Sequence, residues 1–393
     1  MENPFDQFPD RRNTDCIKWR YYAEEVLPMW VADMDFVSPE PVIRALQERA
    51  EHGVFGYPAS VLPDLQATSE LSTAIREILF DRYRWQVLPE DLVFLPGVVT
   101  GLNLACHMVA APGREVLVQP PIYPPMLAAP GYAGLARQEA ELTLEPDGSY
   151  SIDREAFDAS LSEAAAMFML CNPHNPVGRV FRRDELEFMA ECCLRKGVLI
   201  CSDEIHSDLV YTGHSHIPIA SLDPEIARNT ITLMAPSKTY NLAGLQCSFA
   251  VIQNTELRQR YQQSGKGLVS WVNAMGMAAA RVAYQEGGEW LGQLLAYLEG
   301  NRDYLADFIQ TEMPSIRMAR PEGTYLAWLD CRESGIPGSP YEFFLKNGRV
   351  AFIEGRTFGS GGDGFIRLNF GCPREMLAEA LTRMKSALET PPG

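Results

Sequence analysis

The sequence is short of basic residues. Against 51 aspartate and glutamate residues it has 34 lysine and arginine residues, which gives a formal net charge of −17. Surfaces that wrap nucleic acid or dock on anionic lipid need basic patches, so we expect neither nucleic acid nor a membrane as a partner. The charge leaves the substrate open, because a pocket can be locally basic within an acidic surface.

The chain also lacks long apolar stretches and paired-cysteine motifs. Its longest apolar run, AAAMFMLC at 164–171, is too short to cross a bilayer. The first residues, MENPFDQFPDRRNTD, contain no apolar h-region, so we expect no signal peptide. The nine cysteines form no C-x-x-C pair, which favours reduced thiols packed in the core of a cytoplasmic protein.

Short apolar runs alternate with helical patterns through residues 45–285. Runs such as LVFLP, EVLVQP and VLICSD are separated by helical patterns such as VVTGLNLACHMVA and RDELEFMAECCLRKG. This alternation is typical of βαβ units, whose strands pair in parallel and whose helices cover both faces of the sheet. The sequence therefore predicts an α/β fold with a three-layer, mainly parallel sheet in a large domain of residues 45–285.

The remaining sequence has a different pattern. From residue 286 a long helical pattern, EWLGQLLAYLEGNRDYLADFIQTEM, is followed by the strand-like segments TYLAWLD and FIRLNF and by a last helical pattern. We predict a smaller α+β domain that combines residues 286–393 with the N-terminal arm, residues 1–44.

Polar and aromatic side chains follow several of the predicted strands. Ligands of open α/β sheets bind outside the carboxyl ends of the strands, so these residues are site candidates. They are Asp203 after VLIC, His206 three residues later, Asn175 after AAMFMLC, Lys238 after TITLMA and Tyr123 after EVLVQ. Each alone has an ordinary structural explanation, such as a helix cap, a braced turn or core packing.

Together the candidates match the needs of pyridoxal phosphate. This cofactor needs an amine, a carboxylate for its ring nitrogen, donors for its phenolic oxygen, an aromatic face and an anion site for its phosphate. Gly97 lies between a predicted strand and a predicted helix, whose first free N–H groups would bind an anion. Burial would lower the pKa of Lys238 and free its lone pair. The alternative is a lysine whose stem packs while its ammonium reaches water.

Three motifs carry a family resemblance. NPHNPVG, SDEIH and APSKTYNLAGL, with Lys238 lying 35 residues past Asp203, resemble the class I/II aminotransferase superfamily of fold-type I pyridoxal phosphate enzymes. Further motifs resemble the bacterial cystathionine β-lyase and cysteine-S-conjugate β-lyase (C-S lyase) subgroup. They are PMWVADMDF, FGYP, PGVVTGL, PPIYPP and GFIRLNFGCP. The resemblance runs from about residue 28 to the C-terminus.

The resemblance implies roles for the residues around the cofactor ring. Lys238 would hold the cofactor as an imine and then move the substrate's α-proton. Asp203 would face the pyridine nitrogen, and Tyr123 would stack on the ring. Asn175 and His206 would contact or flank the phenolic oxygen. Among these, Lys238, Tyr123 and Asp203 are the expected catalytic residues.

The resemblance also implies how the phosphate is bound. The backbone N–H groups of Val98 and Val99 and the hydroxyl of Ser237 would hold it. Enzymes of this superfamily build their sites at a homodimer interface, so Tyr57 would reach the phosphate of the neighbouring subunit.

The substrate's α-carboxylate would bind Arg367, together with Asn175 and the backbone near Ala32. A guanidinium suits this planar anion because it offers a bidentate fork of N–H groups. The alternative for Arg367 is an exposed strand residue. The segment around Trp30 and Asp33 is expected to meet the thioether tail.

The implied activity is β-elimination from L-cystathionine or a related cysteine thioether, which gives a thiol, pyruvate and ammonia. Many aminotransferases of the superfamily have an arginine eight positions after the lysine, where this chain has Gln246. That difference favours a lyase over an aminotransferase of the same fold and cofactor, which is the alternative. A non-catalytic or regulatory protein that keeps the fold is a third possibility.

Two further patterns do not predict sites of their own. GSGGDG at 359–364 has the letters of a dinucleotide-binding motif, but a strand-like segment follows it where that motif requires a helix. Asp203, His206, His214 and His216 could be taken for metal ligands, but their spacing fits no standard pattern. We therefore expect no metal.

Overall fold

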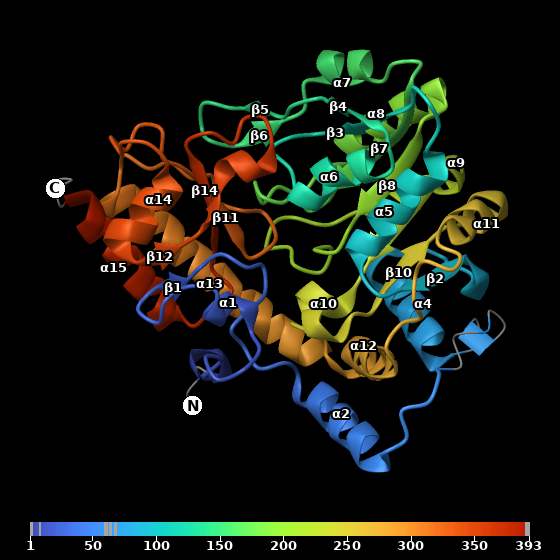
Figure 1. The fold of residues 1–393 in the computed structure, drawn as a ribbon, viewed down its shortest axis with the longest axis horizontal. Helices are drawn as coiled ribbons and strands as arrows, with labels where there is room; N and C mark the ends of the chain where they lie inside the picture. Colours follow the sequence, from blue (N-terminus) through green and yellow to red (C-terminus); the bar gives the residue numbers. More distant parts are fainter. Residues whose placement is uncertain (1–2, 8, 59–61, 63–64, 67–68, 390–393) are drawn as a thin grey trace.

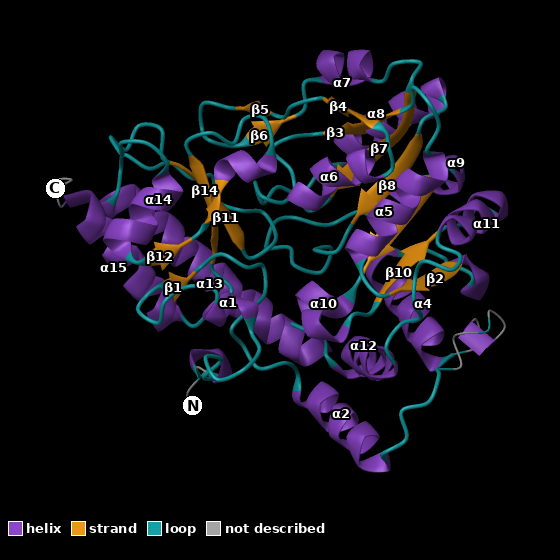
Figure 2. Ribbon diagram, viewed as in Figure 1, coloured by secondary structure: helices purple, strands orange, loops and turns teal. Residues whose placement is uncertain are grey.

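A seven-stranded sheet forms the centre of the computed structural model, which describes residues 3–7, 9–58, 62, 65–66 and 69–389 (Figures 1 and 2). The strand order is β2-β10-β9-β8-β7-β3-β4. The strands are β2 (Leu92–Leu95), β3 (Glu115–Val118), β4 (Ala136–Glu139), β7 (Ala165–Cys171), β8 (Leu199–Asp203), β9 (Thr230–Met234) and β10 (Ser248–Val251). Strand β10 is antiparallel to both of its neighbours, whereas the pairs from β9 to β4 are parallel. The predicted α/β fold with a mainly parallel sheet is confirmed.

Both faces of this sheet are covered, and for this reason its central strands have no polar face. All seven residues of β7 are buried. Met167 and Met169 pack in the cluster that contains α5 (Val98–Val109), while Phe168 and Leu170 pack in the cluster that contains α8 (Arg183–Lys196). Alternate side chains of a strand point to opposite faces, so one strand connects two apolar layers.

The other helices lie around the seven-stranded sheet and around a smaller sheet, which is described below. Those of the first part of the chain are α1 (Ile17–Arg20), α2 (Glu40–His52), α4 (Glu70–Tyr83), α6 (Pro124–Tyr132), α7 (Arg154–Ser160), α9 (Pro224–Arg228) and α10 (Pro236–Thr239). The later helices are α11 (Thr255–Ser264), α12 (Ala274–Glu286), α13 (Gly288–Glu312), α14 (Pro340–Phe343) and α15 (Arg374–Glu389). None of the helices in the described ranges is long and apolar enough to cross a membrane.

A second region, in orange and red in Figure 1, contains the C-terminal part of the chain. Its antiparallel sheet has the order β11-β14-β13, with β11 (Leu326–Asp330), β14 (Phe365–Asn369) and β13 (Ile353–Glu354). The predicted long helix from residue 286 is confirmed as α13, and the two predicted strands are confirmed as β11 and β14. A small hairpin, β5 (Thr143–Leu144) with β6 (Tyr150–Ser151), pairs with neither sheet.

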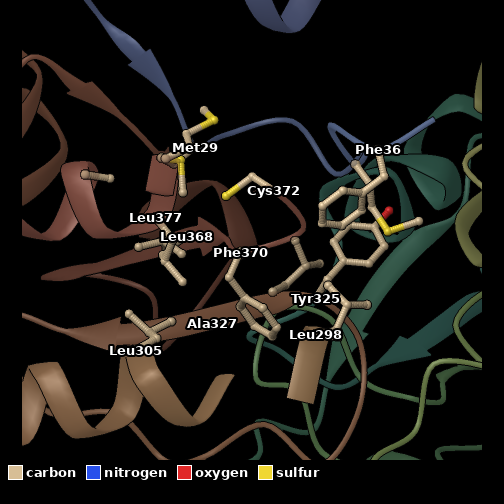
Figure 3. Packing of buried hydrophobic residues seen from close by; sticks show 14 of the residues in the cluster. Met29, Phe36, Leu298, Leu305, Tyr325, Ala327, Leu368, Phe370, Cys372 and Leu377 are labelled. Carbon is tan, nitrogen blue, oxygen red and sulfur yellow. The ribbon is translucent and has the colours of Figure 1, made fainter. Parts of the chain in front are cut away.

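The N-terminal arm packs into this second region. Strand β1 (Leu27–Pro28) pairs in parallel with β12 (Val350–Ala351). Met29 shares one apolar cluster with Leu298 of α13 and Leu368 of β14 (Figure 3). The division into residues 45–285 and residues 1–44 with 286–393 stays a prediction; its first boundary falls inside α2.

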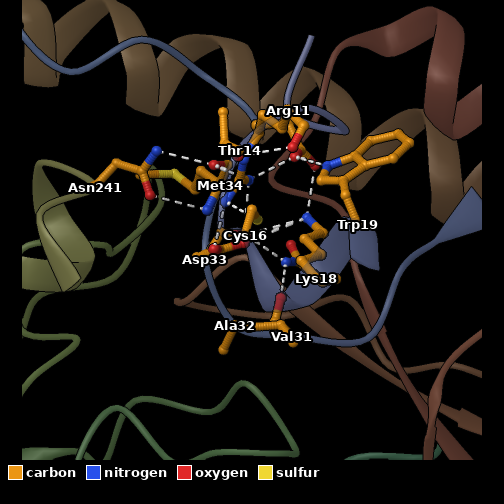
Figure 4. Close-up of polar contacts among 12 residues, drawn as sticks. Arg11, Thr14, Cys16, Lys18, Trp19, Val31, Ala32, Asp33, Met34 and Asn241 are labelled. Atoms are coloured by element: carbon orange, nitrogen blue, oxygen red, sulfur yellow. Dashed lines mark hydrogen bonds and ion pairs between the residues drawn. The ribbon is translucent and has the colours of Figure 1, made fainter. Parts of the chain in front are cut away.

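A buried cluster of charges fixes the arm (Figure 4). Asp35, whose side chain is fully buried, accepts hydrogen bonds from Lys18 Nζ at 2.6 Å, Arg11 Nη1 at 2.6 Å and Trp19 Nε1 at 2.9 Å. Arg11 also pairs with Asp33 at 2.7 Å. Two cations face two carboxylates, so the buried charge is balanced, and removal of one member leaves another buried without its partner.

Lys18→Ala is expected to lower the free energy of unfolding by about 3 kcal/mol, because the Asp35 carboxylate then stays buried with less compensation. Urea unfolding of the two proteins measures the change. Arg20→Ala on the same helix is the control, because its pair with Asp15 is exposed, and it should cost less than about 1 kcal/mol. Equal losses in the two variants would contradict the importance of the buried cluster.

Candidate active site

A cavity of about 440 Å³ lies at the carboxyl ends of β7, β8 and β9. It is lined by residues from the strand ends, the segment after β1 and the first turn of α5. Nine residues that the sequence predicted line it: Ala32, Val98, Val99, Tyr123, Asn175, Asp203, His206, Ser237 and Lys238. Because parallel strands end at the same edge, the residues that follow β7, β8 and β9 meet here. The N-terminal arm adds Ala32, which contacts Lys238 although the two residues are 206 positions apart in the chain.

Two predicted residues do not line the cavity. Arg367 on β14 is 4% exposed and adjoins it through Asn175, whose Oδ1 accepts from Arg367 Nη1 at 3.0 Å. The exposed-strand alternative for Arg367 is therefore wrong. Tyr57 is 85% exposed, and its ring lies 5.2 Å from that of Trp271. Its predicted contact with a neighbouring subunit's phosphate stays a prediction.

Lys238 presents its amine inside the cavity. Pro236 starts the short helix α10 directly after β9, and this turn places Lys238 at the end of the strand. Its Nζ donates to the carbonyl oxygen of Ala32 at 2.5 Å. Burial lowers the pKa of Lys238 to about 8, and the charge of Arg367 acts in the same direction. At neutral pH a sizeable minority of the amine is therefore unprotonated and nucleophilic.

Asp203 is the last residue of β8 and is 3% exposed. Its Oδ1 accepts a hydrogen bond from the N–H of Ile205 at 3.2 Å. Burial raises the pKa of Asp203 to about 7, while that hydrogen bond and the charge of Lys238 oppose the shift. A carboxylate in this position is ready for a cationic N–H partner, because such a partner would offset the cost of desolvation.

His206 and Tyr123 add neutral groups to the same cavity. His206 is 2% exposed, and its Nδ1 has no hydrogen-bond partner among the described residues. Burial and the charges of Lys238 and Arg367 hold the pKa of His206 well below its usual value, so the imidazole is neutral. Burial also raises the pKa of Tyr123, and the charge of Asp203 adds to the effect, so the phenol keeps its proton. The unpartnered Nδ1 is a group that a ligand could satisfy.

The N-terminus of α5 supplies an anion site. The helix begins at Val98 after Gly97, and its first N–H groups have no acceptor within the helix. Ser237 and Gln246 line the same cavity. An anion held here is met by neutral donors and the helix dipole rather than by an arginine at position 246.

The sequence did not predict several of the lining residues. Thr100, Cys171, Ser248 and Ser270 also line the cavity. Thr100 could have been found from its place in the first turn of α5, whereas Ser270 follows α11 in a segment without any motif.

His216 and the GSGGDG segment, which predicted no site, occupy ordinary structural positions. His216 Nε2 pairs with the buried carboxylate of Glu204 at 2.8 Å. The GSGGDG segment, residues 359–364, is followed directly by the strand β14, as expected, and no helix follows it there. A dinucleotide site requires the N-terminus of a helix directly after the glycines, and this segment is followed by a strand instead.

Fold and site together define an α/β protein with a lysine amine, a buried carboxylate and a helix N-terminus in one cavity. Residues 25–384 match the model of the aminotransferase class I and II family, and the chain belongs to that family. It is 41% identical to the cystathionine beta-lyase PatB of Bacillus subtilis over 98% of this chain and 99% of that protein.

Two solved structures extend this similarity to three dimensions. Cystalysin from Treponema denticola, which contains a pyridoxal 5′-phosphate cofactor, superposes with a TM-score of 0.93 at 31% identity, over 99% of both chains. The pyridoxal phosphate-bound C-S lyase from Staphylococcus hominis superposes with a TM-score of 0.91 at 32% identity, also over 99% of both chains.

Asp203→Asn is expected to stabilise the cofactor-free protein at pH 8. The raised pKa means that wild-type stability is full below the unfolded-state pKa near 3.8 and is lost as the pH rises to about 7. An amide has no such dependence, so the variant should be more stable by up to about 4 kcal/mol at pH 8 and by almost nothing near pH 4. Urea unfolding as a function of pH measures the difference.

The exposed variant Asp184→Asn, which removes a surface carboxylate, is the control for this measurement. If Asp203→Asn raises the free energy of unfolding by the same amount at pH 4 and at pH 8, burial does not raise the pKa of Asp203 as stated above.

Proposed function

We propose that the protein is a pyridoxal phosphate-dependent C-S β-lyase that cleaves L-cystathionine or a related cysteine S-conjugate to a thiol, pyruvate and ammonia. The observation that carries the proposal is the Lys238 amine, which shares a cavity with the buried Asp203 carboxylate and the N-terminus of α5. The similarity to the cystathionine beta-lyase PatB along nearly the whole chain supports the reaction class.

The residues present fit pyridoxal phosphate. Lys238 would hold it covalently, and Asp203 would hold the proton on its ring nitrogen. Asn175 and His206 would face its phenolic oxygen, and the unpartnered Nδ1 of His206 is available for such a contact. Tyr123, which lines the same cavity, would pack on the ring.

The phosphate would bind at the start of α5, which lines the same cavity. The N–H groups of Val98 and Val99 and the hydroxyl of Ser237 would donate to it, as the start of a helix favours. When bound, the cofactor supplies an electron sink that makes the α-hydrogen of an amino acid acidic.

Once the amine of the substrate has displaced Lys238 from the cofactor, the freed Lys238 amine would act as the base that takes the α-proton. A pKa of about 8 lies close enough to neutrality for the amine both to accept a proton at Nζ and to give it up. The Asp203 carboxylate accepts a hydrogen bond from the N–H of Ile205, and its negative charge would favour a proton on the ring nitrogen.

Arg367 would orient the substrate through its α-carboxylate, together with Asn175 and the backbone of Ala32. Its guanidinium is held by Asn175 Oδ1 and by the carbonyl oxygen of Trp30, each at 3.0 Å, and its Nε has no partner among the described residues. The N–H groups that these bonds leave free can form the charge-assisted contacts that a carboxylate requires.

A homodimer with shared active sites is the second part of the proposal. Exposed apolar residues occur in two segments that meet at the Tyr57–Trp271 ring pair. They are Val54, Phe55 and Tyr57 after α2, and Leu268 and Trp271 after α11. A second cavity of about 700 Å³, which Trp271 helps to line, shares Ser270 with the first. A second copy on this surface would bury the apolar side chains and close the site.

We place the protein in the cytoplasm. All nine cysteines are free thiols and eight of them are buried, as suits a reducing compartment.

The reaction is tested with purified protein and L-cystathionine. We expect free thiol and pyruvate in equal amounts, and a yellow protein whose chromophore borohydride fixes to the peptide that carries Lys238. Lys238→Ala should lose both the adduct and the turnover. Amino transfer to a keto acid without release of thiol would instead identify an aminotransferase, and a protein without any adduct would contradict the proposed cofactor.

The shared site is tested by mixing two inactive variants. Lys238→Ala lacks the amine, and Tyr57→Ala removes the side chain proposed to reach the neighbouring subunit. In a heterodimer one site has both residues intact, so a fully exchanged 1:1 mixture should recover about a quarter of the wild-type activity. A mixture that shows no more activity than the mean of the two separate variants would contradict the shared site.

A further inference from the structure

Residues 30–36 form a segment that touches both cations of the site through backbone carbonyl groups. The carbonyl oxygen of Ala32 accepts from Lys238 Nζ at 2.5 Å, and that of Trp30 accepts from Arg367 Nη2 at 3.0 Å. Tyr325 also donates its hydroxyl to Ala32 at 2.9 Å. The position of this short segment therefore decides where the amine and the guanidinium lie.

Asn241 holds this segment from the side of the large sheet (Figure 4). Its side-chain nitrogen donates to the carbonyl oxygens of Met34 at 2.8 Å and Phe36 at 2.9 Å, and its side-chain oxygen accepts from the N–H of Met34 at 3.0 Å. Two of these partners are acceptors and one is a donor, so a single orientation of the amide satisfies all three bonds. The backbone oxygen of Asn241 accepts a fourth bond from Ser38 Oγ.

Asn241 is also coupled to Lys238 through the backbone. The turn that contains both residues is closed by hydrogen bonds from the N–H of Tyr240 to Pro236 at 2.9 Å and from the N–H of Leu242 to Ser237 at 2.9 Å. Asn241 has φ 58°, in the left-handed region that asparagine and glycine adopt at low cost. The lysine and the amide therefore form one rigid unit.

Asn369 holds the same segment from the opposite side. It lies two positions after Arg367 on β14, and its side-chain nitrogen donates to the carbonyl oxygens of Asp33 at 2.7 Å and of Val31. Each asparagine is thus close in sequence to one of the two cations and bonded to the segment that both cations contact.

We propose that Asn241 is a positioning residue of the active site: through Met34 and Phe36 it fixes the carbonyl groups that meet the Lys238 amine and the Arg367 guanidinium. The inference builds on the proposed function and adds a residue to which the sequence motifs gave no role. Asn241 does not touch substrate or cofactor, so it acts through the segment 30–36.

Asn241→Gly removes the three side-chain bonds without backbone strain, because glycine adopts a positive φ freely. We expect KM for L-cystathionine to rise about tenfold, with a smaller fall in kcat. We also expect the cofactor-free variant to capture pyridoxal phosphate about tenfold more slowly, measured as the adduct fixed by borohydride. Displacements well under an ångström at reacting groups are sufficient for effects of this size.

Asn241→Asp is the second variant, and it serves alone if the glycine variant does not fold. It keeps the acceptor for Met34 but places a carboxylate oxygen against the carbonyl groups of Met34 and Phe36, so both effects should be larger than in the glycine variant. Asn254→Ala is the matched control. The Asn254 side chain also makes three hydrogen bonds, to Arg228, Glu256 and Leu257, but it lies at the start of α11.

The control should lose thermal stability while KM and the capture rate stay within twofold of wild type. Asn241 variants that behave like the control would overturn the positioning role. If the Asn241 variants behave in this way while wild-type protein captures the cofactor normally, only the positioning role of Asn241 is overturned and the proposed function stands. Wild-type protein that forms no borohydride adduct would overturn the proposed function and the inference together.

Discussion

The site depends on the removal of three ionisable groups from water, two of them in the cavity and the third beside it. Asp203 and Arg367 are buried and Lys238 is half-buried, and desolvation is the largest cause of the pKa shift of each: lowered for the lysine and the arginine, raised for the aspartate. In water the amine would be almost fully protonated at neutral pH and a poor nucleophile. The apolar strands β7, β8 and β9 create the dry environment, so the core of the sheet is itself part of the chemistry.

The desolvation of these charged groups lowers the free energy of unfolding, and two features of the structure offset this loss. Each buried charge has a polar group near it: the Ala32 carbonyl for Lys238, the Ile205 N–H for Asp203, and Asn175 for Arg367. One apolar cluster contains residues of both sheets, and another joins the N-terminal arm to the smaller sheet (Figure 3). The arm contributes a wall of the site, and its charged residues are neutralised by one another rather than by the reacting groups.

Much of this organisation could be predicted from the sequence. The strands around the site are short apolar runs that end in a polar residue, so their order along the chain gave the α/β fold and placed Asp203, Asn175 and Lys238 at one edge. The family motifs added Val98, Val99, Ser237 and Arg367. Tyr57 stays a prediction, because a role in a neighbouring subunit cannot be seen in one chain.

What the sequence could not predict depends on tertiary contacts between distant segments. The hydrogen bond from Lys238 to Ala32 joins residues 206 positions apart. Its acceptor is a backbone carbonyl oxygen, which every residue has, so the residue type at position 32 does not reveal it. Ser270 lies in a segment without periodicity or motif. The hydrogen bond from the N–H of Met34 to the side-chain oxygen of Asn241 depends on how the N-terminal arm packs. Local patterns carry no information about such pairings.

The central claim is that the Lys238 amine is the covalent attachment point of the cofactor. The most direct measurement is a crystal structure of the protein grown with pyridoxal phosphate in excess. We expect continuous density from Nζ of Lys238 to the cofactor, with Asp203 at hydrogen-bond distance from the ring nitrogen and the phosphate at the start of α5. Density that shows Nζ still bonded to the Ala32 carbonyl, with an empty cavity beside it, would contradict the claim.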